Sequence, residues 1–131
     1  MNSTHPQDTG EFADRYVAVW NERDTQARRR LIEALWSVEG IEFTEENEYQ
    51  GYVALETRIA AAHNEFVEKG RFLFRLGNDP AAHHDTVTFN VDMTPAAGGK
   101  PEWSGVVFAA LGGDGLIERD YQFGQIGRAS W

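Results

Sequence analysis

Apolar residues recur at helical spacing in three segments of the first half of the chain. In the first segment Phe12, Tyr16 and Trp20 share one helical face, and Asp8 with Glu11 three residues later is typical of a capping box at a helix start. This spacing predicts three helices. The helices are predicted to end near Asn21, before Gly40 and at Gly70, and Asp24 is the predicted N-cap of the second. The apolar stripe of the second helix is Leu31, Ile32, Leu35 and Trp36. The stripe of the third is Leu55, Ile59, His63 and Phe66.

After Gly70 the apolar period changes to two, which is typical of strands. The clearest case runs from Thr86 to Thr94, where apolar and polar residues alternate strictly. Turn-rich stretches at 95–101 and 112–115 separate the last strands, and such short connections predict an antiparallel meander. The predicted strands cover about 41–44, 71–76, 86–94, 102–111 and 116–125, and 44–51 is predicted to be a loop.

Three helices followed by a meander indicate a segregated α+β domain, because parallel strands would need helices between them. We predict a single domain over 1–131, with a core of about 10–126 and tails at 1–9 and 127–131. The predicted strand through Val106–Ala110 is apolar on both faces, so its outer face needs cover. We expect a homodimer through the sheet to provide that cover.

The composition narrows the possible function classes. The chain has no cysteine, which excludes disulfides, thiolate nucleophiles and Cys-ligated metals. Its formal net charge of −9 disfavours nucleic acid and anionic lipid surfaces, and no apolar run is long enough to span a membrane. His83 and His84 are adjacent at a strand start and should face opposite ways, so they are not expected to share a metal ion. We expect a cytoplasmic protein that uses no cofactor and no metal and has no nucleic-acid or membrane partner.

Four short runs carry a resemblance to a known family: Tyr16–Asn21, Tyr49–Tyr52, Ala82–Asp85 and Asp114–Ile117. With the order of elements, they make the chain from about 12 to 123 similar to the SnoaL-like branch of the nuclear transport factor 2-like superfamily. The resemblance implies a cone-shaped fold in which three N-terminal helices pack on a curved, mainly antiparallel sheet around a pocket. Similar proteins include polyketide cyclases, ketosteroid isomerases, dehydratases and epoxide hydrolases, so the fold does not name the chemistry.

Asp92 and Asp120 stand inside predicted strands, where aspartate is uncommon. The run Arg119–Tyr121 is similar to the last-strand run of limonene-type epoxide hydrolases, and this resemblance implies that Asp120 is a general base and Asp92 the facing acid. Asn90 stands where that family has the arginine that joins the two. A carboxylate in an apolar cavity has a raised pKa, which also suits an isomerase or a cyclase.

Both aspartates also have a structural interpretation. Asp92 would then lie on the solvent face of an amphipathic strand. Asp120 would form a surface ion pair with Arg119, Arg71 or Arg75, which contributes only about 0 to 1 kcal/mol.

His63 lies on the apolar stripe of the third helix and is predicted to point into the cone as an acid/base or orienting group. The alternative is a core imidazole that is hydrogen-bonded to a tyrosine or to the backbone. The remaining predicted ligand contacts, which could also be core only, are Tyr16, Trp20, Tyr49, Tyr52, Phe66, Asn90 and Phe108, and a tyrosine among them would donate to a developing oxyanion.

Three hypotheses about function follow. The first is a cofactor-independent acid/base enzyme of the cyclase, isomerase or dehydratase type on a small hydrophobic molecule, with Asp120, His63 and Asp92 as proton-transfer groups; an epoxide hydrolase-like hydrolase is an alternative. The second is a non-catalytic protein that binds a small ligand in the same pocket. The third is an interaction module whose cavity is filled by Trp and Phe side chains.

Overall fold

The first half of the chain is mainly helical. The computed structural model describes residues 6–126. Helix α1 spans Pro6–Asn21, α2 spans Thr25–Leu35, and α3 spans Tyr52–Ala62 and continues into a π-helical segment, η1, at His63–Lys69. None of the helices described is long and apolar enough to cross a membrane.

Local signals explain where the helices begin and end. The Asp24 side chain accepts a hydrogen bond from the backbone N of Ala27 at 2.8 Å, which confirms it as the N-cap of α2. Helix α1 starts earlier than predicted, so Asp8 lies in its first turn, where a carboxylate favours the helix dipole. Gly70 follows η1, and its N–H donates to the carbonyl of Glu65.

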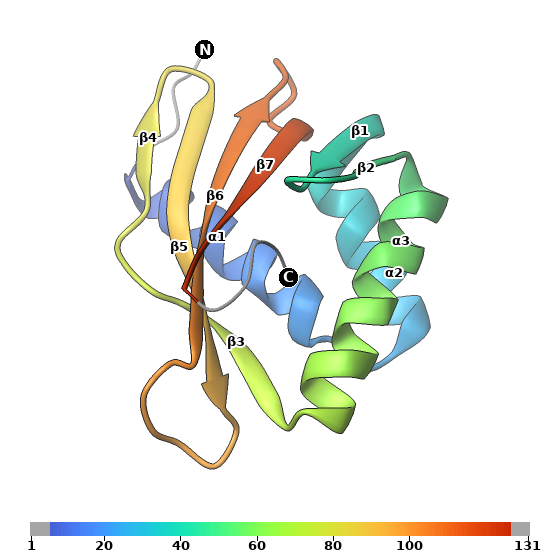
Figure 1. Ribbon diagram of the computed structural model, residues 1–131. Coiled ribbons are helices and arrows are strands. Elements are labelled where there is room, and N and C mark those ends of the chain that lie inside the picture. The colour runs from blue at the N-terminus through green and yellow to red at the C-terminus, as the bar shows by residue number, and fades with distance from the viewer. Residues whose placement is uncertain (1–5, 127–131) are drawn as a thin grey trace.

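The strands form one curved sheet in the order β2-β1-β7-β6-β5-β3, with β4 beside β5 (Figure 1). The β5-β6-β7 meander is antiparallel, as predicted, and β1 pairs with β7 in parallel. The fold class predicted from the sequence is therefore confirmed. The strands are β1 (Trp36–Phe43), β2 (Glu48–Gln50), β3 (Phe72–Leu76), β4 (Ala81–His83), β5 (Thr86–Pro95), β6 (Trp103–Leu111) and β7 (Ile117–Ile126).

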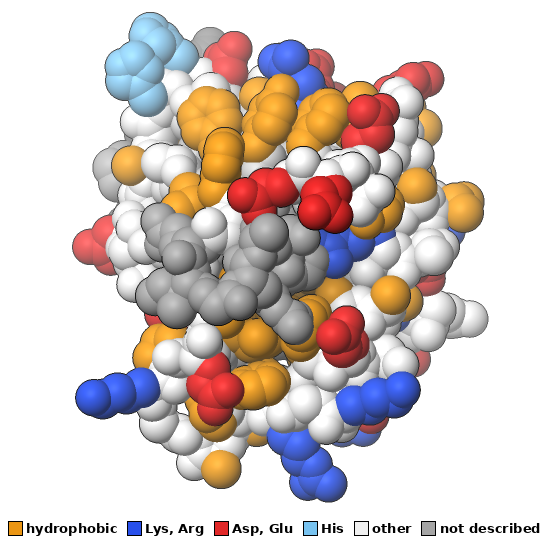
Figure 2. Space-filling view, viewed as in Figure 1, with side chains coloured by type: hydrophobic (Ala, Val, Ile, Leu, Met, Phe, Trp, Pro, Cys, Tyr) orange, Lys and Arg blue, Asp and Glu red, His pale blue; other side chains and the backbone are white. Residues whose placement is uncertain are grey.

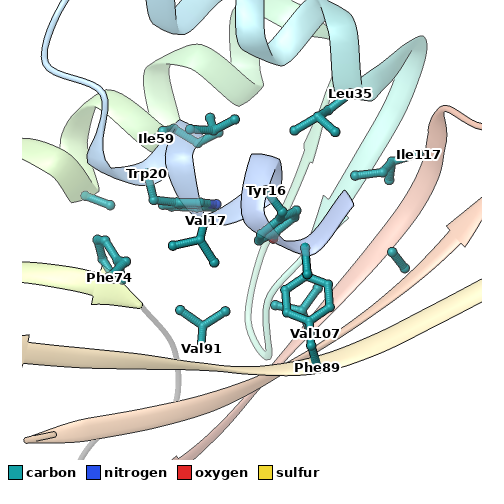
Figure 3. Packing of buried hydrophobic residues seen from close by; sticks show 14 of the residues in the cluster. Tyr16, Val17, Trp20, Leu35, Ile59, Phe74, Phe89, Val91, Val107 and Ile117 are labelled. Carbon is teal, nitrogen blue, oxygen red and sulfur yellow. The ribbon is translucent and has the colours of Figure 1, made fainter. Parts of the chain in front are cut away.

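Helix α1 lies across one face of the sheet, which we call the inner face, and α3 packs beside β1 and β2 (Figure 1). Val17 and Trp20 of α1 point toward Phe74 and Val91 of the strands (Figure 3). The core is rich in aromatic rings that are almost completely buried. The largest of them are Trp20, Trp36, Trp103, Tyr16, Phe74 and Phe89.

The prediction was wrong about where β1 begins. The strand starts at Trp36, not near Ile41, because Trp36 already has extended backbone angles and pairs with Ile117 of β7. The predicted loop at 44–51 also contains the short strand β2. Of the predicted tails, 1–5 and 127–131 lie outside the described residues, and 6–9 belong to α1.

Candidate functional site

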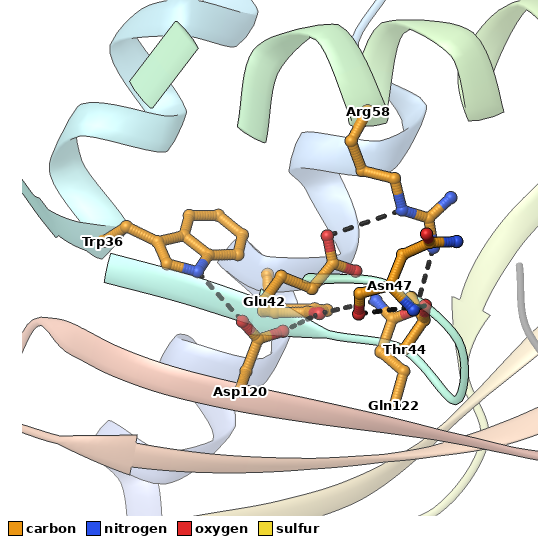
Figure 4. A network of polar contacts seen from close by, with 8 residues as sticks. Trp36, Glu42, Thr44, Asn47, Arg58, Asp120 and Gln122 are labelled. Carbon is orange, nitrogen blue, oxygen red and sulfur yellow. Dashed lines mark hydrogen bonds and ion pairs between the residues drawn. The ribbon is translucent and has the colours of Figure 1, made fainter. Parts of the chain in front are cut away.

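Asp120 lies at the centre of a buried polar network. It belongs to β7 and has no solvent-exposed surface. Its carboxylate accepts a hydrogen bond from the Tyr16 hydroxyl at 2.6 Å through Oδ2. Its Oδ1 accepts another from the Trp36 indole at 3.0 Å (Figure 4). These two donors come from α1 and β1, so two elements hold a carboxylate that a third, β7, carries. The alternative of a surface ion pair is therefore not what the structure shows.

The network continues along β7 to Gln122, which shares the inner face with Asp120. The Gln122 amide donates from Nε2 to the Tyr16 hydroxyl at 3.1 Å and accepts through Oε1 from the Arg58 guanidinium, also at 3.1 Å. Arg58 is on α3 and lies over the network from the side opposite to β7 (Figure 4). A continuous chain of hydrogen bonds thus runs from Asp120 to a cation that is 10% exposed.

Glu42 is the second carboxyl in this network. It faces Asp120 across the parallel β1–β7 pair, and it is completely buried. Its Oε1 lies 3.5 Å from Nε of Arg58, an ion pair without a well-formed hydrogen bond. The Arg58 guanidinium also lies over the rings of Trp20 and Tyr49, at 5.2 and 5.4 Å from their centroids. Two carboxyls therefore share one cation in the interior.

Burial changes the acid/base properties of all three acidic groups. Desolvation raises the pKa of Glu42 to about 8, against the opposing effect of Arg58. Desolvation also raises the pKa of Asp120 to about 6, against the opposing effect of the hydrogen bonds from Tyr16 and Trp36. Burial and the neighbouring Asp120 raise the pKa of Tyr16 well above its ordinary value, so its hydroxyl stays a donor. Near neutral pH the network therefore favours an ionised Asp120 and a protonated Glu42.

His63 is buried, as predicted, but it lies in a different environment from Asp120. Burial lowers its pKa, and the charged groups that act on it are mainly Arg28 and Glu68. It makes a hydrogen bond to the backbone of Asn21, while its Nε2 has no hydrogen-bond partner. His63 therefore lies near the end of α1, and nothing in its contacts joins it to the network.

Three predicted site residues lie on the opposite, outer face of the sheet. Val91 and Met93 point inward from β5, so strand alternation places Asn90 and Asp92 outward, and Asp92 accepts a hydrogen bond from Ser104 on β6. Phe108 of β6 also points outward and is 38% exposed. These residues do not line the interior with Asp120, and the pairing of Asp92 with Asp120 that the resemblance implied is not formed.

The other predicted contacts lie on the helical side of the sheet. Tyr16 and Trp20 are fully buried, and Phe66 packs against Phe74 in the core. Tyr49 and Tyr52 are half-buried, and the Tyr52 hydroxyl donates to the backbone carbonyl of Trp36 at 3.1 Å. Tyr16, Trp20 and Tyr49 thus contact the network directly.

The prediction about the two adjacent histidines needs correction. His84 has a positive φ of 55°, so the chain turns there and the rings of His83 and His84 contact each other, with centroids 4.4 Å apart. Among residues 6–126, no group of three or more His, Asp or Glu side chains is arranged to hold a metal ion.

Solved structures share this arrangement of helices and sheet, although no family model and no curated protein matches the sequence. A candidate isomerase of the SnoaL-like family from Agrobacterium tumefaciens superposes with a TM-score of 0.79 at 23% identity, over 88% of this chain and 95% of that chain. The chain has the nuclear transport factor 2-like fold. A nuclear transport factor 2-like protein of unknown function from Exiguobacterium is 21% identical, with a TM-score of 0.61 over 87% of this chain and 98% of that one. A candidate polyketide cyclase from Sinorhizobium meliloti has 16% identity and a TM-score of 0.64, over 90% and 98% of the two chains.

The sequence of this nuclear transport factor 2-like chain predicted only part of the site, namely Asp120 with Tyr16, Trp20 and Tyr49. Glu42, Arg58, Gln122 and the polar role of Trp36 were not predicted. Two signals were available: Glu42 is a charged residue between apolar neighbours in a short strand, and Gln122 follows Asp120 by two residues and must share its face. Arg58, next to Ile59 on the third helix, gave no comparable signal.

Proposed function

We propose that this chain binds a small, hydrophobic, uncharged molecule and transfers a proton on it, with Asp120 as the proton acceptor. The observation that carries the proposal is the buried Asp120 carboxylate, held by Tyr16 and Trp36 with a pKa near 6. A base with that pKa is largely ionised at neutral pH and still basic enough to accept a proton from carbon or water.

The energetic cost of the network supports a functional role over a structural one. Burying two carboxyls and one guanidinium stabilises a fold less than apolar side chains of similar volume would. Strongly perturbed pKa values in such clusters are typical of functional sites. Both carboxyls of the network are buried, so a ligand reaches them only when covering side chains move. Arg58, whose side chain is 10% exposed, and the half-buried Tyr49 are the partly exposed groups beside them.

A carbon-acid probe tests this proposal without knowledge of the natural substrate. We expect the wild-type protein to accelerate exchange of the α-hydrogens of 2-tetralone, an apolar ketone, with D₂O, as followed by proton NMR. A free carboxylate at the same concentration as the protein serves as the control. Saturable binding of 2-tetralone with exchange no faster than in this control would instead favour the alternative of a non-catalytic ligand-binding protein.

We also propose that a second copy of the chain covers the outer face of the sheet. Phe43 and Tyr121 stack with centroids 4.9 Å apart, and Phe108 lies 6.3 Å from Tyr121. Together they form an aromatic row across β1, β7 and β6, and Figure 2 shows a row of hydrophobic side chains crossing this face. Phe108 and Phe123 are 38% and 50% exposed. An uncharged row of this kind is self-complementary, as a twofold interface requires.

Replacing Phe108 by glutamate should convert this dimer to a monomer, because a charge would be buried at the centre of the interface. Sedimentation velocity measures the change. Val53→Glu is the control, since Val53 is 70% exposed and belongs to α3, not to a strand of the sheet. A wild-type chain that sediments as a monomer at high concentration, or a Phe108→Glu variant that remains dimeric, would contradict the proposal.

A further inference from the structure

Three atoms of the buried network lack hydrogen-bond partners. They are both carboxyl oxygens of Glu42 and Nε of Arg58. Glu42 is fully buried, and the Arg58 side chain is 10% exposed. Buried polar atoms in folded proteins almost always have a partner, so three unpartnered atoms that face one another need an explanation.

The contrast with Asp120 shows that the fold is able to satisfy a carboxylate here. Each oxygen of Asp120 accepts a hydrogen bond from a side chain of a different element. Glu42 lies on the neighbouring strand, with the same face inward, and its Oε1 lies 3.5 Å from Nε of Arg58, but neither of its oxygens has a well-formed hydrogen bond. The free hydrogen-bonding capacity is thus confined to the Glu42–Arg58 pair.

Arg58 is held in place, so it does not simply move to complete its contact with Glu42. One terminal nitrogen of its guanidinium donates to Gln122 at 3.1 Å, and the group lies over Trp20 and Tyr49. Its Nε–H therefore remains a charged donor directed toward Glu42, which offers an acceptor oxygen whether or not it is protonated.

We propose that Glu42 and Arg58 bind a hydroxyl group of a neutral alcohol or phenol, which accepts from Nε of Arg58 and donates to a Glu42 oxygen. A hydroxyl is both donor and acceptor, so one group satisfies both residues. The rings of Trp20 and Tyr49, which already contact the guanidinium, provide apolar surface for the rest of such a ligand. A carboxylate or phosphate is disfavoured, because Glu42 and Asp120 already share a single cation.

This inference rests on the proposed small-molecule function and names the class of ligand for the same site. Three probes that share a tolyl group test it: para-cresol, toluene and para-toluate, titrated by NMR into the wild-type chain. We expect para-cresol to bind about tenfold more tightly than toluene, as one charge-assisted hydrogen bond predicts, and para-toluate to bind more weakly than para-cresol.

Two variants of Glu42 assign the preference to this residue. In Glu42→Leu the ratio of para-cresol to toluene affinity should fall, because only the Arg58 donor remains, while Glu42→Gln, which keeps an acceptor oxygen, should retain most of the preference. Glu39→Leu is the matched control, because Glu39 lies on the same strand and is exposed. Circular dichroism establishes that each variant is folded, and Glu42→Gln keeps the test informative should Glu42→Leu not fold.

The outcomes separate this inference from the proposed function. Equal affinity for para-cresol and toluene, a preference for para-toluate, or an undiminished preference in Glu42→Leu would overturn the hydroxyl site while leaving the proposed small-molecule binding and the role of Asp120 intact. Failure of all three probes to bind the wild-type chain would overturn both. Absence of 2-tetralone exchange together with the expected probe preference would overturn only the catalytic proposal.

Discussion

Replacing Glu42 by glutamine is expected to remove most of the loss of stability that the wild-type chain shows as the pH rises from 4.5 to about 8. Burial raises the pKa of Glu42 to about 8, so the folded chain keeps a proton that the unfolded chain has already released. The stabilising effect of this proton is complete below the unfolded pKa and is lost as the pH rises through the folded one. The free energy of unfolding should fall by about 1.4 kcal/mol per pH unit inside this window, or roughly 5 kcal/mol in total.

Urea unfolding of both proteins at a series of pH values measures this effect. The charged and titratable groups around Glu42 are Arg58, Asp120 and Tyr16. Asp120 has a raised pKa as well, and its contribution has the same sign but ends near pH 6, so the interval from 6 to 8 reports on Glu42. The exposed Glu39→Gln variant should retain the wild-type pH dependence. Equal slopes for wild type and Glu42→Gln between pH 6 and 8 would show that Glu42 is ionised in the folded chain.

Replacing Asp120 by asparagine should reduce the 2-tetralone exchange rate by at least about 100-fold, because general-base catalysis typically contributes a factor of about 10² to 10⁴. Asparagine keeps the volume and one acceptor oxygen, so either Tyr16 or Trp36 retains its hydrogen bond, and the fold should persist. In the wild type the rate should rise with pH through about 6 and then level off, since the ionised form of Asp120 is the active one.

A second variant tests whether the pH dependence of the exchange rate comes from Asp120. In Tyr16→Phe the 2.6 Å hydrogen bond to Asp120 is lost, and this bond lowers the pKa of Asp120. The rise of the exchange rate should therefore move to higher pH while the plateau remains. An Asp120→Asn variant with wild-type exchange, or a Tyr16→Phe variant with an unmoved profile, would remove Asp120 from the role of base.

Much of the fold could be predicted because its signals are local. The strict alternation of Thr86–Thr94 and the turns around the last two strands determine the meander, and the Asp24 cap determines the start of α2. The start of β1 could not be predicted in this way. Trp36 continues a helical stripe in the sequence, and it becomes extended through pairing with Ile117, which lies 81 positions later.

The candidate site was harder to predict because it depends on which face each residue occupies. Alternation in β5 places Asp92 with the threonines on the outer face, and this was readable from the sequence. In β7, Ile117 and Asp120 are both buried although three positions separate them, because the pairing with β6 shifts register between Ile117 and Arg119. Simple alternation from Ile117 would have turned Asp120 outward, and no local signal marks this shift.

The parallel pairing of β1 with β7 also has a consequence for biosynthesis. Glu42 leaves the ribosome long before Asp120 and Gln122, because β7 is the last of the described strands to be synthesised. Glu42 therefore meets its neighbours on β7 only late in synthesis. A nascent chain that stops before β7 thus contains β1 without the strand that pairs with it along one edge. Chains truncated near residue 116 should consequently be recognised by chaperones that bind unpaired strands, and release should coincide with synthesis of the final strand.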